Sequence, residues 1–251
     1  MLFQSVFVIR RDFEKEFRDQ VGARYAGRVA VEYVFQSRDD LPGGAVAPAG
    51  REKPWGTGHA VWCARAALTD PFAVVGADDF FGAEAFRQLA GFLTRPPASA
   101  GGPHRFAMLG YRLDRTLSEH GTVSRGLCRV GPGSQLVSIE ERHGIDGASL
   151  AAAGLRGDGT VSMNCFGFTP ALFPALDVQL RAFLAAQGGD PKAEFYLPAA
   201  VSTMIARHEA TVEVLPTGDT WFGVTNRADK PRVEAALAAL VRAGIYPSRL
   251  F

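Results

Sequence analysis

The sequence lacks several features that would assign a protein to a class at once. It has three cysteines in 251 residues, Cys63, Cys128 and Cys165. Their wide spacing among apolar neighbours excludes the usual zinc patterns and predicts reduced thiols. No apolar run reaches roughly 18 residues, and no signal-peptide pattern follows Met1. We therefore expect a cytoplasmic protein without a membrane partner.

An excess of charge of one sign is also absent. Lys and Arg total 27 and Asp and Glu total 26, so the net charge of +1 provides no basic surface for nucleic acid. The sequence contains no G-x-S-x-G, H-E-x-x-H or P-loop motif, which argues against acyl transfer, zinc proteolysis and ordinary ATPase chemistry. Hydrophobic residues make up 47% of the chain, enough to bury a full core.

Segments with strand and helix patterns alternate along the chain, without a repeat or a compositional break. This order predicts one α/β domain over residues 1–251, with an antiparallel insertion. The expected strands are 2–9, 29–35, 72–75, 106–113, 127–130, 135–141, 161–168 and 211–215. The expected helices begin near 13, 57, 84, 170, 194 and 229.

The most informative segment is Lys53-Pro-Trp-Gly-Thr-Gly-His-Ala-Val61. Apolar residues at helical spacing follow it, so it reads as a glycine loop that opens a helix. Gly56 and Gly58 have no Cβ, which allows a backbone to approach a ligand closely and to present N–H groups. His59 is equally compatible with contact to a base and with a structural role.

Two carboxylates follow the next predicted strand, in the segment Ala77-Asp78-Asp79-Phe80-Phe81-Gly82. Open α/β sheets place ligands beyond the carboxyl ends of their strands. Magnesium takes oxygen ligands, usually one or two carboxylates with substrate phosphates. A nucleotide–magnesium site is therefore indicated; the alternative is a polar strand end or a helix cap before Glu84.

These motifs resemble the sugar-phosphate nucleotidyltransferases, or NDP-sugar pyrophosphorylases, and most closely the bacterial UTP–glucose-1-phosphate uridylyltransferases. The resemblance spans most of the chain in the family's order. Further segments that carry it are Glu119-His-Gly-Thr-Val123, Ile139-Glu-Glu-Arg142, Asn164-Cys-Phe-Gly167, Glu194-Phe-Tyr196 and Gly223-Val-Thr-Asn-Arg227. It implies a Rossmann-like nucleotide-diphospho-sugar transferase fold, a mixed and mostly parallel sheet flanked by helices.

The resemblance also implies roles for single residues. Asp78 corresponds to the family's Mg²⁺ ligand; the second ligand position falls on Thr225, with Asn226 beside it as a candidate. The nucleotide would be surrounded by Gly56, Thr57, Gly58 and His59. The sugar hydroxyls would be held by Gly121, Glu141, Asn164 and Glu194.

Several of the matching positions have an alternative role or depart from the family's pattern. Arg142 stands where the family often has a phosphate-binding Lys, although Glu141 and Arg142 could also form an exposed ion pair at a strand end. Asn164 lies in an apolar strand and needs hydrogen-bond partners if it is buried. The family's usual Thr-Asp after Glu194 is replaced by Pro198-Ala199.

One departure from the family concerns the amino-terminal end. Family members open with a strand and a Gly-x-Gly-x-Arg loop that holds the triphosphate. Here the first predicted strand ends Val8-Ile-Arg-Arg-Asp-Phe13, without glycine, and resembles the family's second βα unit. A first βα unit is therefore expected to be missing, and catalysis to be impaired.

The expected reaction transfers a nucleoside monophosphate from an NTP, UTP in the first instance, to a sugar 1-phosphate, giving an NDP-sugar and pyrophosphate. The nucleophile is already an anionic phosphate oxygen, so positioning and charge neutralisation by Mg²⁺ and basic side chains suffice. The alternatives are a glycosyltransferase of related fold and a non-catalytic sugar-nucleotide-binding protein. The sequence identifies neither the sugar nor the oligomeric state, and a homo-oligomer is compatible with it.

Overall fold

The computed structural model describes residues 4–96, 101–118, 121–147, 150–223 and 229–249. The chain divides into two compact units. The first unit comprises Met1–Val74, Leu93–Phe106 and Gly167–Val212. The second unit comprises Val75–Phe92, Ala107–Phe166 and Glu213–Phe251. The single domain expected over residues 1–251 stays a prediction.

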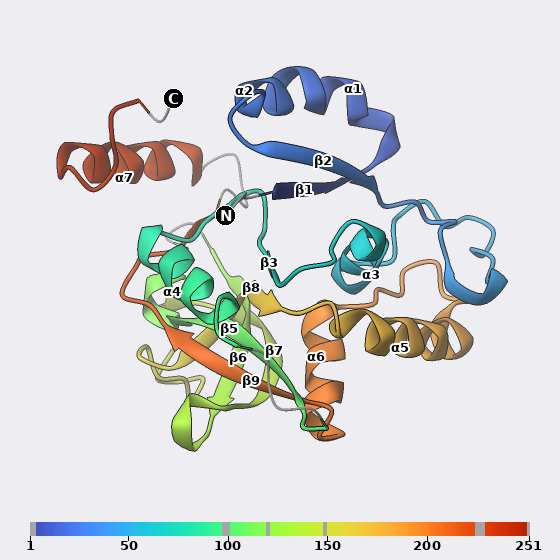
Figure 1. The fold of residues 1–251 in the computed structure, drawn as a ribbon. Helices are drawn as coiled ribbons and strands as arrows, with labels where there is room; N and C mark the ends of the chain where they lie inside the picture. The colour runs from blue at the N-terminus through green and yellow to red at the C-terminus, as the bar shows by residue number, and fades with distance from the viewer. Residues whose placement is uncertain (1–3, 97–100, 119–120, 148–149, 224–228, 250–251) are drawn as a thin grey trace. The chain divides into compact units, whose positions relative to one another are not determined.

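The first unit begins with a parallel pair of strands, β1 (Gln4–Ile9) and β2 (Ala30–Phe35), in register from Gln4↔Ala30 to Ile9↔Phe35. The helical stretch between them contains α1 (Glu14–Phe17), a π-helical turn and α2 (Ala23–Tyr25). It lies over the two strands in Figure 1. Because the rings of Phe7, Phe17 and Tyr33 contact one another, aromatic packing holds the helical stretch to the strands.

The rest of the first unit packs around three helices, α3 (Thr57–Cys63), α5 (Leu172–Gln187) and α6 (Leu197–Ala206). Helix α3 contacts both α5 and α6. Phe72 of β3 (Phe72–Val74) stacks on Phe173, with ring centroids 5.4 Å apart. The contacts with α5 and α6 hold α3, and the glycine motif lies at the start of this helix.

A larger sheet has the strand order β7-β6-β8-β5-β9, with β3 pairing with β8. Its strands are β5 (His104–Arg112), β6 (Val123–Val130), β7 (Leu136–Ile145), β8 (Thr160–Phe168) and β9 (Ala210–Pro216). Strand β6 is antiparallel to both β7 and β8. The sheet residues of the second unit include fully buried Met108, Leu109 and Phe166.

The second unit also holds a short antiparallel ribbon of β4 (Asp79–Phe80) and β10 (Phe222–Gly223), in which Gly223 pairs with Asp79. Helix α4 (Ala83–Leu93) follows β4, and α7 (Lys230–Arg242) follows β10. The carboxylate of Asp219 accepts hydrogen bonds from the backbone N–H groups of Glu84 (2.9 Å) and Ala85 (3.2 Å). This carboxylate therefore caps the first turn of α4.

The alternation of strands and helices is confirmed, and several boundaries differ from expectation. Strands β6 and β7 are longer than predicted. Helix α6 begins at Leu197, so Glu194 lies before it. Pro198 stands in the first turn of α6, where a missing N–H costs little. Across the described ranges, no helix is both long enough and apolar enough to span a bilayer.

Candidate functional site

The glycine motif is held in the first unit by hydrogen bonds to a distant stretch of chain, residues 195–197. The N–H of Gly58 donates to the carbonyl of Phe195 (2.9 Å), and the N–H of Phe195 donates to the carbonyl of Trp55 (2.6 Å). The N–H of Leu197 donates to the hydroxyl oxygen of Thr57 (3.0 Å). The start of α3 and the start of α6 are thus joined side by side.

Gly56 and Gly58 allow the chain to pack closely against Phe195. A Cβ on Gly58 would lie 2.7 Å from Cδ1 of Phe195, and one on Gly56 would lie 2.9 Å from the Phe195 carbonyl oxygen. Gly56 also has a φ of 94°, which side chains disfavour. We expected the missing Cβ atoms to make room for a ligand, but the chain itself fills that space. The nucleotide-binding role of Gly56, Thr57 and Gly58 stays a prediction.

His59 is fully buried. One ring nitrogen lies 3.2 Å from the amide of Gln36 and the other 2.8 Å from the carbonyl of Asp40. Burial lowers the pKa of the imidazole, so the neutral ring is favoured. Of the two roles that the sequence left open for His59, these contacts favour the structural one.

Glu194 is half-buried and lies next to the glycine motif. A Cβ added to Gly56 would be 3.2 Å from the Cβ of Glu194. Arg51, which sequence reasoning missed, fixes the adjoining chain. Its guanidinium donates to the carbonyls of Pro54 (2.9 Å) and Ala193 (2.8 Å) and lies over the ring of Trp55 at 3.4 Å. The first unit therefore brings Glu194 together with the predicted nucleotide residues.

The acidic pair, Asp78 and Asp79, lies in the second unit, in a turn that follows Gly76. Asp78 is exposed and Asp79 is half-buried. A Cβ on Gly76 would lie 3.3 Å from Oδ1 of Asp78 and 3.1 Å from Cγ of Asp79. The two carboxyl groups therefore converge above one glycine. Burial, and after it the charge of Asp78, raises the pKa of Asp79 to about 6, while Arg125 opposes the shift.

This donor set fits a magnesium ion. Two neighbouring carboxylates repel each other, and a hard divalent cation offsets that repulsion while accepting further oxygen ligands from a substrate. Within the described ranges, no group of three or more His, Cys, Asp or Glu side chains is placed to hold a metal ion. Asn226, the candidate second ligand, lies outside the described residues, as does Thr225.

The predicted sugar contacts of the second unit lie on exposed backbone. Asn164 is exposed in the middle of β8 with a φ of 56°, a left-handed conformation that costs energy within a strand. Gly121 has a φ of 131°, and a Cβ there would meet open space. Strained, exposed polar residues in a regular sheet are typical of binding positions, but the sugar role stays a prediction.

Glu141 and Arg142 are exposed on β7. A Cβ on Gly126 of β6 would lie 3.7 Å from Oε2 of Glu141. In the described part of the chain neither Glu141 nor Arg142 has an ion-pair partner. The alternative of a strand-end ion pair is therefore not supported. Both residues lie within β7 and not at its end.

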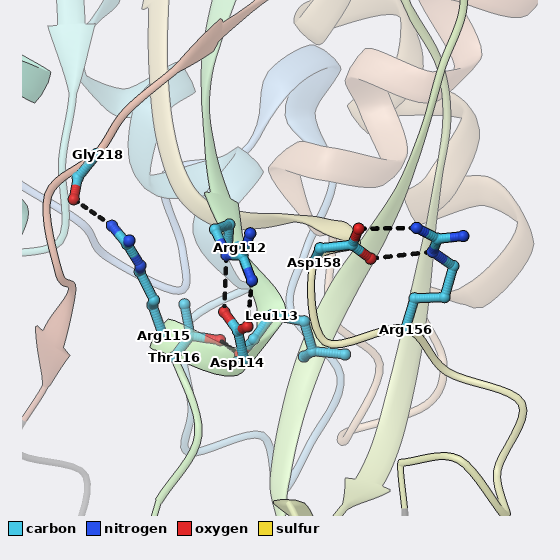
Figure 2. A network of polar contacts seen from close by, with 8 residues as sticks. All are labelled: Arg112, Leu113, Asp114, Arg115, Thr116, Arg156, Asp158 and Gly218. Atoms are coloured by element: carbon cyan, nitrogen blue, oxygen red, sulfur yellow. Dashed lines mark hydrogen bonds and ion pairs between the residues drawn. The ribbon is translucent and has the colours of Figure 1, made fainter.

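Arg125 of β6 is a second residue that sequence reasoning missed. It is only 9% exposed, and its charge acts on Asp79 and Glu141. Its side chain donates to Thr116, whose hydroxyl in turn donates to the carbonyl of Leu113 at 3.0 Å. In Figure 2, Thr116 lies next to Arg115, which reaches across to the carbonyl of Gly218. No local signal marked Arg125 in the sequence, since the expected strand 127–130 begins two residues after it.

Comparison with protein-family models finds no match for this chain. Comparison with curated proteins finds none either. Solved structures do match it. One is assigned as a glucose-1-phosphate thymidylyltransferase from Bacillus anthracis in complex with sucrose, with 10% identity and a TM-score of 0.57, covering 92% of this chain and 74% of that one.

A second matching structure is a mannose-1-phosphate geranyltransferase from Thermus thermophilus, with 19% identity and a TM-score of 0.51. The match covers 92% of this chain but spans only 64% of the length of that one. At these identities the likeness establishes the fold. The prediction of a Rossmann-like mixed α/β fold, with a central sheet flanked by helices, is thereby confirmed.

Proposed function

We propose that this chain is a sugar-1-phosphate nucleotidyltransferase that forms an NDP-sugar and pyrophosphate from an NTP and a sugar 1-phosphate. The observation that carries the proposal is the convergence of Asp78 and Asp79 above Gly76, on a fold shared with a glucose-1-phosphate thymidylyltransferase. UTP is the proposed nucleotide, because the glycine motif resembles that of the uridylyltransferases. The proposed location is the cytoplasm.

The reaction suits the kinds of side chain present. A sugar 1-phosphate carries its own anionic nucleophile, so no general base is required. Magnesium, when bound by Asp78 and Asp79, would supply neutralisation of phosphate charge. Glu141, Asn164 and Gly121 would orient the sugar hydroxyls, and Glu194 would add a further contact. Arg142 would bind phosphate, and residues 56–58 would bind the nucleotide. Catalysis would thus depend on positioning and electrostatics.

The proposal is tested by a pyrophosphate-release assay with several NTPs and sugar 1-phosphates in the presence of Mg²⁺. Asp78→Ala is expected to abolish turnover without unfolding the protein, since Asp78 is exposed. Asp70→Ala, which removes an exposed carboxylate just before β3, is the matched control and should keep full turnover.

One result would revise the metal ligand, and two would contradict the proposed function. Full turnover in Asp78→Ala together with loss in Asp79→Ala would move the metal ligand by one residue. Absence of pyrophosphate release with tight binding of UDP-glucose would indicate a binding protein. Transfer of the glucosyl group from UDP-glucose to an acceptor, with release of UDP, would indicate a glycosyltransferase.

A further inference from the structure

The guanidinium of Arg125 is buried with part of its hydrogen-bonding capacity unused. Its Nε–H donates to the hydroxyl of Thr116 (3.0 Å), one terminal nitrogen donates to the carbonyl of Ser124 (2.7 Å) and the other to the carbonyl of Thr116. A guanidinium has five N–H groups. Two donors, one on each terminal nitrogen, therefore remain after these bonds, and all the acceptors are neutral.

Arg125 also lacks a directly bonded counter-charge. Buried arginines are normally paired with an anion. Among the residues that the structure describes, no carboxylate forms an ion pair with Arg125; Asp79 and Glu141 act on it only from a longer range. Burial lowers the pKa of Arg125 to about 10, so the side chain is still positively charged at pH 7.

A second arginine stands directly opposite. In the register of β6 and β7, Arg125 pairs with Arg142. Side chains at directly opposed positions are close neighbours, and like charges there destabilise a sheet. Two opposed arginines, one of them buried, are therefore unfavourable unless a negatively charged group comes between or beside them.

The ring of Trp221 adds another unused donor. The guanidinium carbon of Arg125 lies 5.0 Å from the ring centroid. The indole N–H of Trp221 is buried and has no acceptor among the described residues. A Cβ on Gly223 would lie 2.5 Å from Cζ2 of Trp221 and 3.1 Å from Oδ1 of Asp79, so the indole adjoins the acidic pair. A ligand rich in oxygen acceptors would satisfy the two unused donors of Arg125 and the one of Trp221.

The surrounding chain holds these donors in place. The backbone N–H groups of Leu113 and Asp114 donate to the carbonyls of Gly159 and Gly157, each at 2.8 Å. Arg115 bonds to the carbonyl of Gly218, three residues before Trp221, as Figure 2 shows. The segment that holds Arg125 and the segment that carries Trp221 are thus tied together. Rigid placement of donors before a ligand arrives is what anion recognition requires.

We propose that Arg125 and Trp221 bind the phosphate group of the sugar 1-phosphate. The inference rests on the proposed function and adds two residues to its site. The position of Arg125 supports the choice of ligand. Its charge interacts electrostatically with Asp79, next to the proposed metal ligand, and with Glu141, a proposed sugar contact. A phosphate joined to a sugar is the group that belongs between a metal and the sugar hydroxyls. The guanidinium fork matches two phosphate oxygens.

The test is calorimetric titration with glucose 1-phosphate, inorganic pyrophosphate and uncharged glucose, with Mg²⁺ present. Arg125→Gln is expected to weaken binding of glucose 1-phosphate by roughly ten-fold or more, the usual effect of losing a charge-assisted hydrogen bond. Trp221→Phe keeps an aromatic ring but loses the indole N–H, and should weaken the binding of glucose 1-phosphate by a smaller factor. Binding of glucose should not change. Arg129→Gln removes an exposed arginine from the same strand and is the matched control, expected to bind as the wild type does.

Because Arg125→Gln also removes bonds to Thr116, the wild-type protein supplies a second measurement. The side-chain ¹⁵N resonances of Arg125 should shift on addition of glucose 1-phosphate and should not shift with glucose. Unchanged affinity in Arg125→Gln, a loss confined to pyrophosphate, or resonances that do not respond would each overturn the proposal.

Failure of the proposed function would look different. If the protein releases no pyrophosphate with any substrate pair, yet Arg125→Gln loses glucose 1-phosphate binding, the nucleotidyltransferase assignment falls and the phosphate site stands. If the wild type turns over and Arg125→Gln has the same KM for the sugar 1-phosphate, the assignment stands and the phosphate site falls.

Discussion

Replacement of Gly58 by alanine tests whether the glycine motif serves the packing of the chain. The added methyl would lie 2.7 and 2.8 Å from two ring carbons of Phe195 and 3.0 Å from its carbonyl oxygen. The ring could turn away, but the carbonyl is fixed by its hydrogen bond from Gly58. Overpacking of this kind costs about 1–3 kcal/mol, and the helix preference of alanine offsets at most about 1 kcal/mol. We expect Gly58→Ala to lower the free energy of unfolding by about 1–2 kcal/mol.

The measurement is urea denaturation, with Gly91→Ala as the control. Gly91 lies within α4, and a Cβ there would meet nothing within 4 Å, so the same substitution should stabilise by about 0.5–1 kcal/mol. In a Phe195→Leu background, Gly58→Ala should cost less than in the wild type, because the ring is gone. Wild-type stability of Gly58→Ala, combined with a large loss of UTP affinity, would refute the packing argument and restore a glycine loop that faces the nucleotide.

Two further predictions concern the second unit. Asp219→Ala should lower the free energy of unfolding by about 1 kcal/mol in urea denaturation, because it leaves two N–H groups of α4 without their acceptor, whereas Asp219→Asn should cost less. Asp79→Asn should stabilise the protein by roughly 1–2 kcal/mol at pH 7 and leave stability nearly unchanged at pH 4, as measured by unfolding across that range. The sign follows from a folded-state pKa of about 6, above the unfolded value near 3.8: the folded protein holds the proton longer, so the contribution of Asp79 falls as pH rises between these values. If the wild type instead became more stable relative to Asp79→Asn as the pH rose between these values, the prediction would be contradicted.

Much of the fold could be predicted from periodicity, because apolar spacing directly reflects which face of an element is buried. The strand at Phe72 and the helix that contains Glu84 are examples. Strands β4 and β10 were missed, since two residues each are too few to show a period. Helix α6 begins three residues later than predicted, because Glu194–Tyr196 is helix-compatible in sequence but pairs with the glycine motif. That pairing joins distant parts of the chain, which local patterns do not record.

The site residues could be predicted only where a local sequence motif marks them. The carboxylates of Asp78 and Asp79 do converge, as expected for two acids in one turn. The packing of Gly58 against Phe195 could not be predicted, since the two residues are far apart in the sequence. Arg125 escaped notice because its meaning depends on burial and on the opposed Arg142, and both are properties of the folded sheet.

The cap that Asp219 provides has a consequence for local motion. Its carboxylate is held to α4 by the backbone N–H groups of Glu84 and Ala85, and the same short segment carries Gly218 and Trp221. Whenever that segment lifts away, those two amides lose their acceptor and become open to solvent exchange. Deuterium uptake at Glu84 and Ala85 therefore reports how often the chain around Trp221 opens, and a ligand that holds the indole in place would slow it.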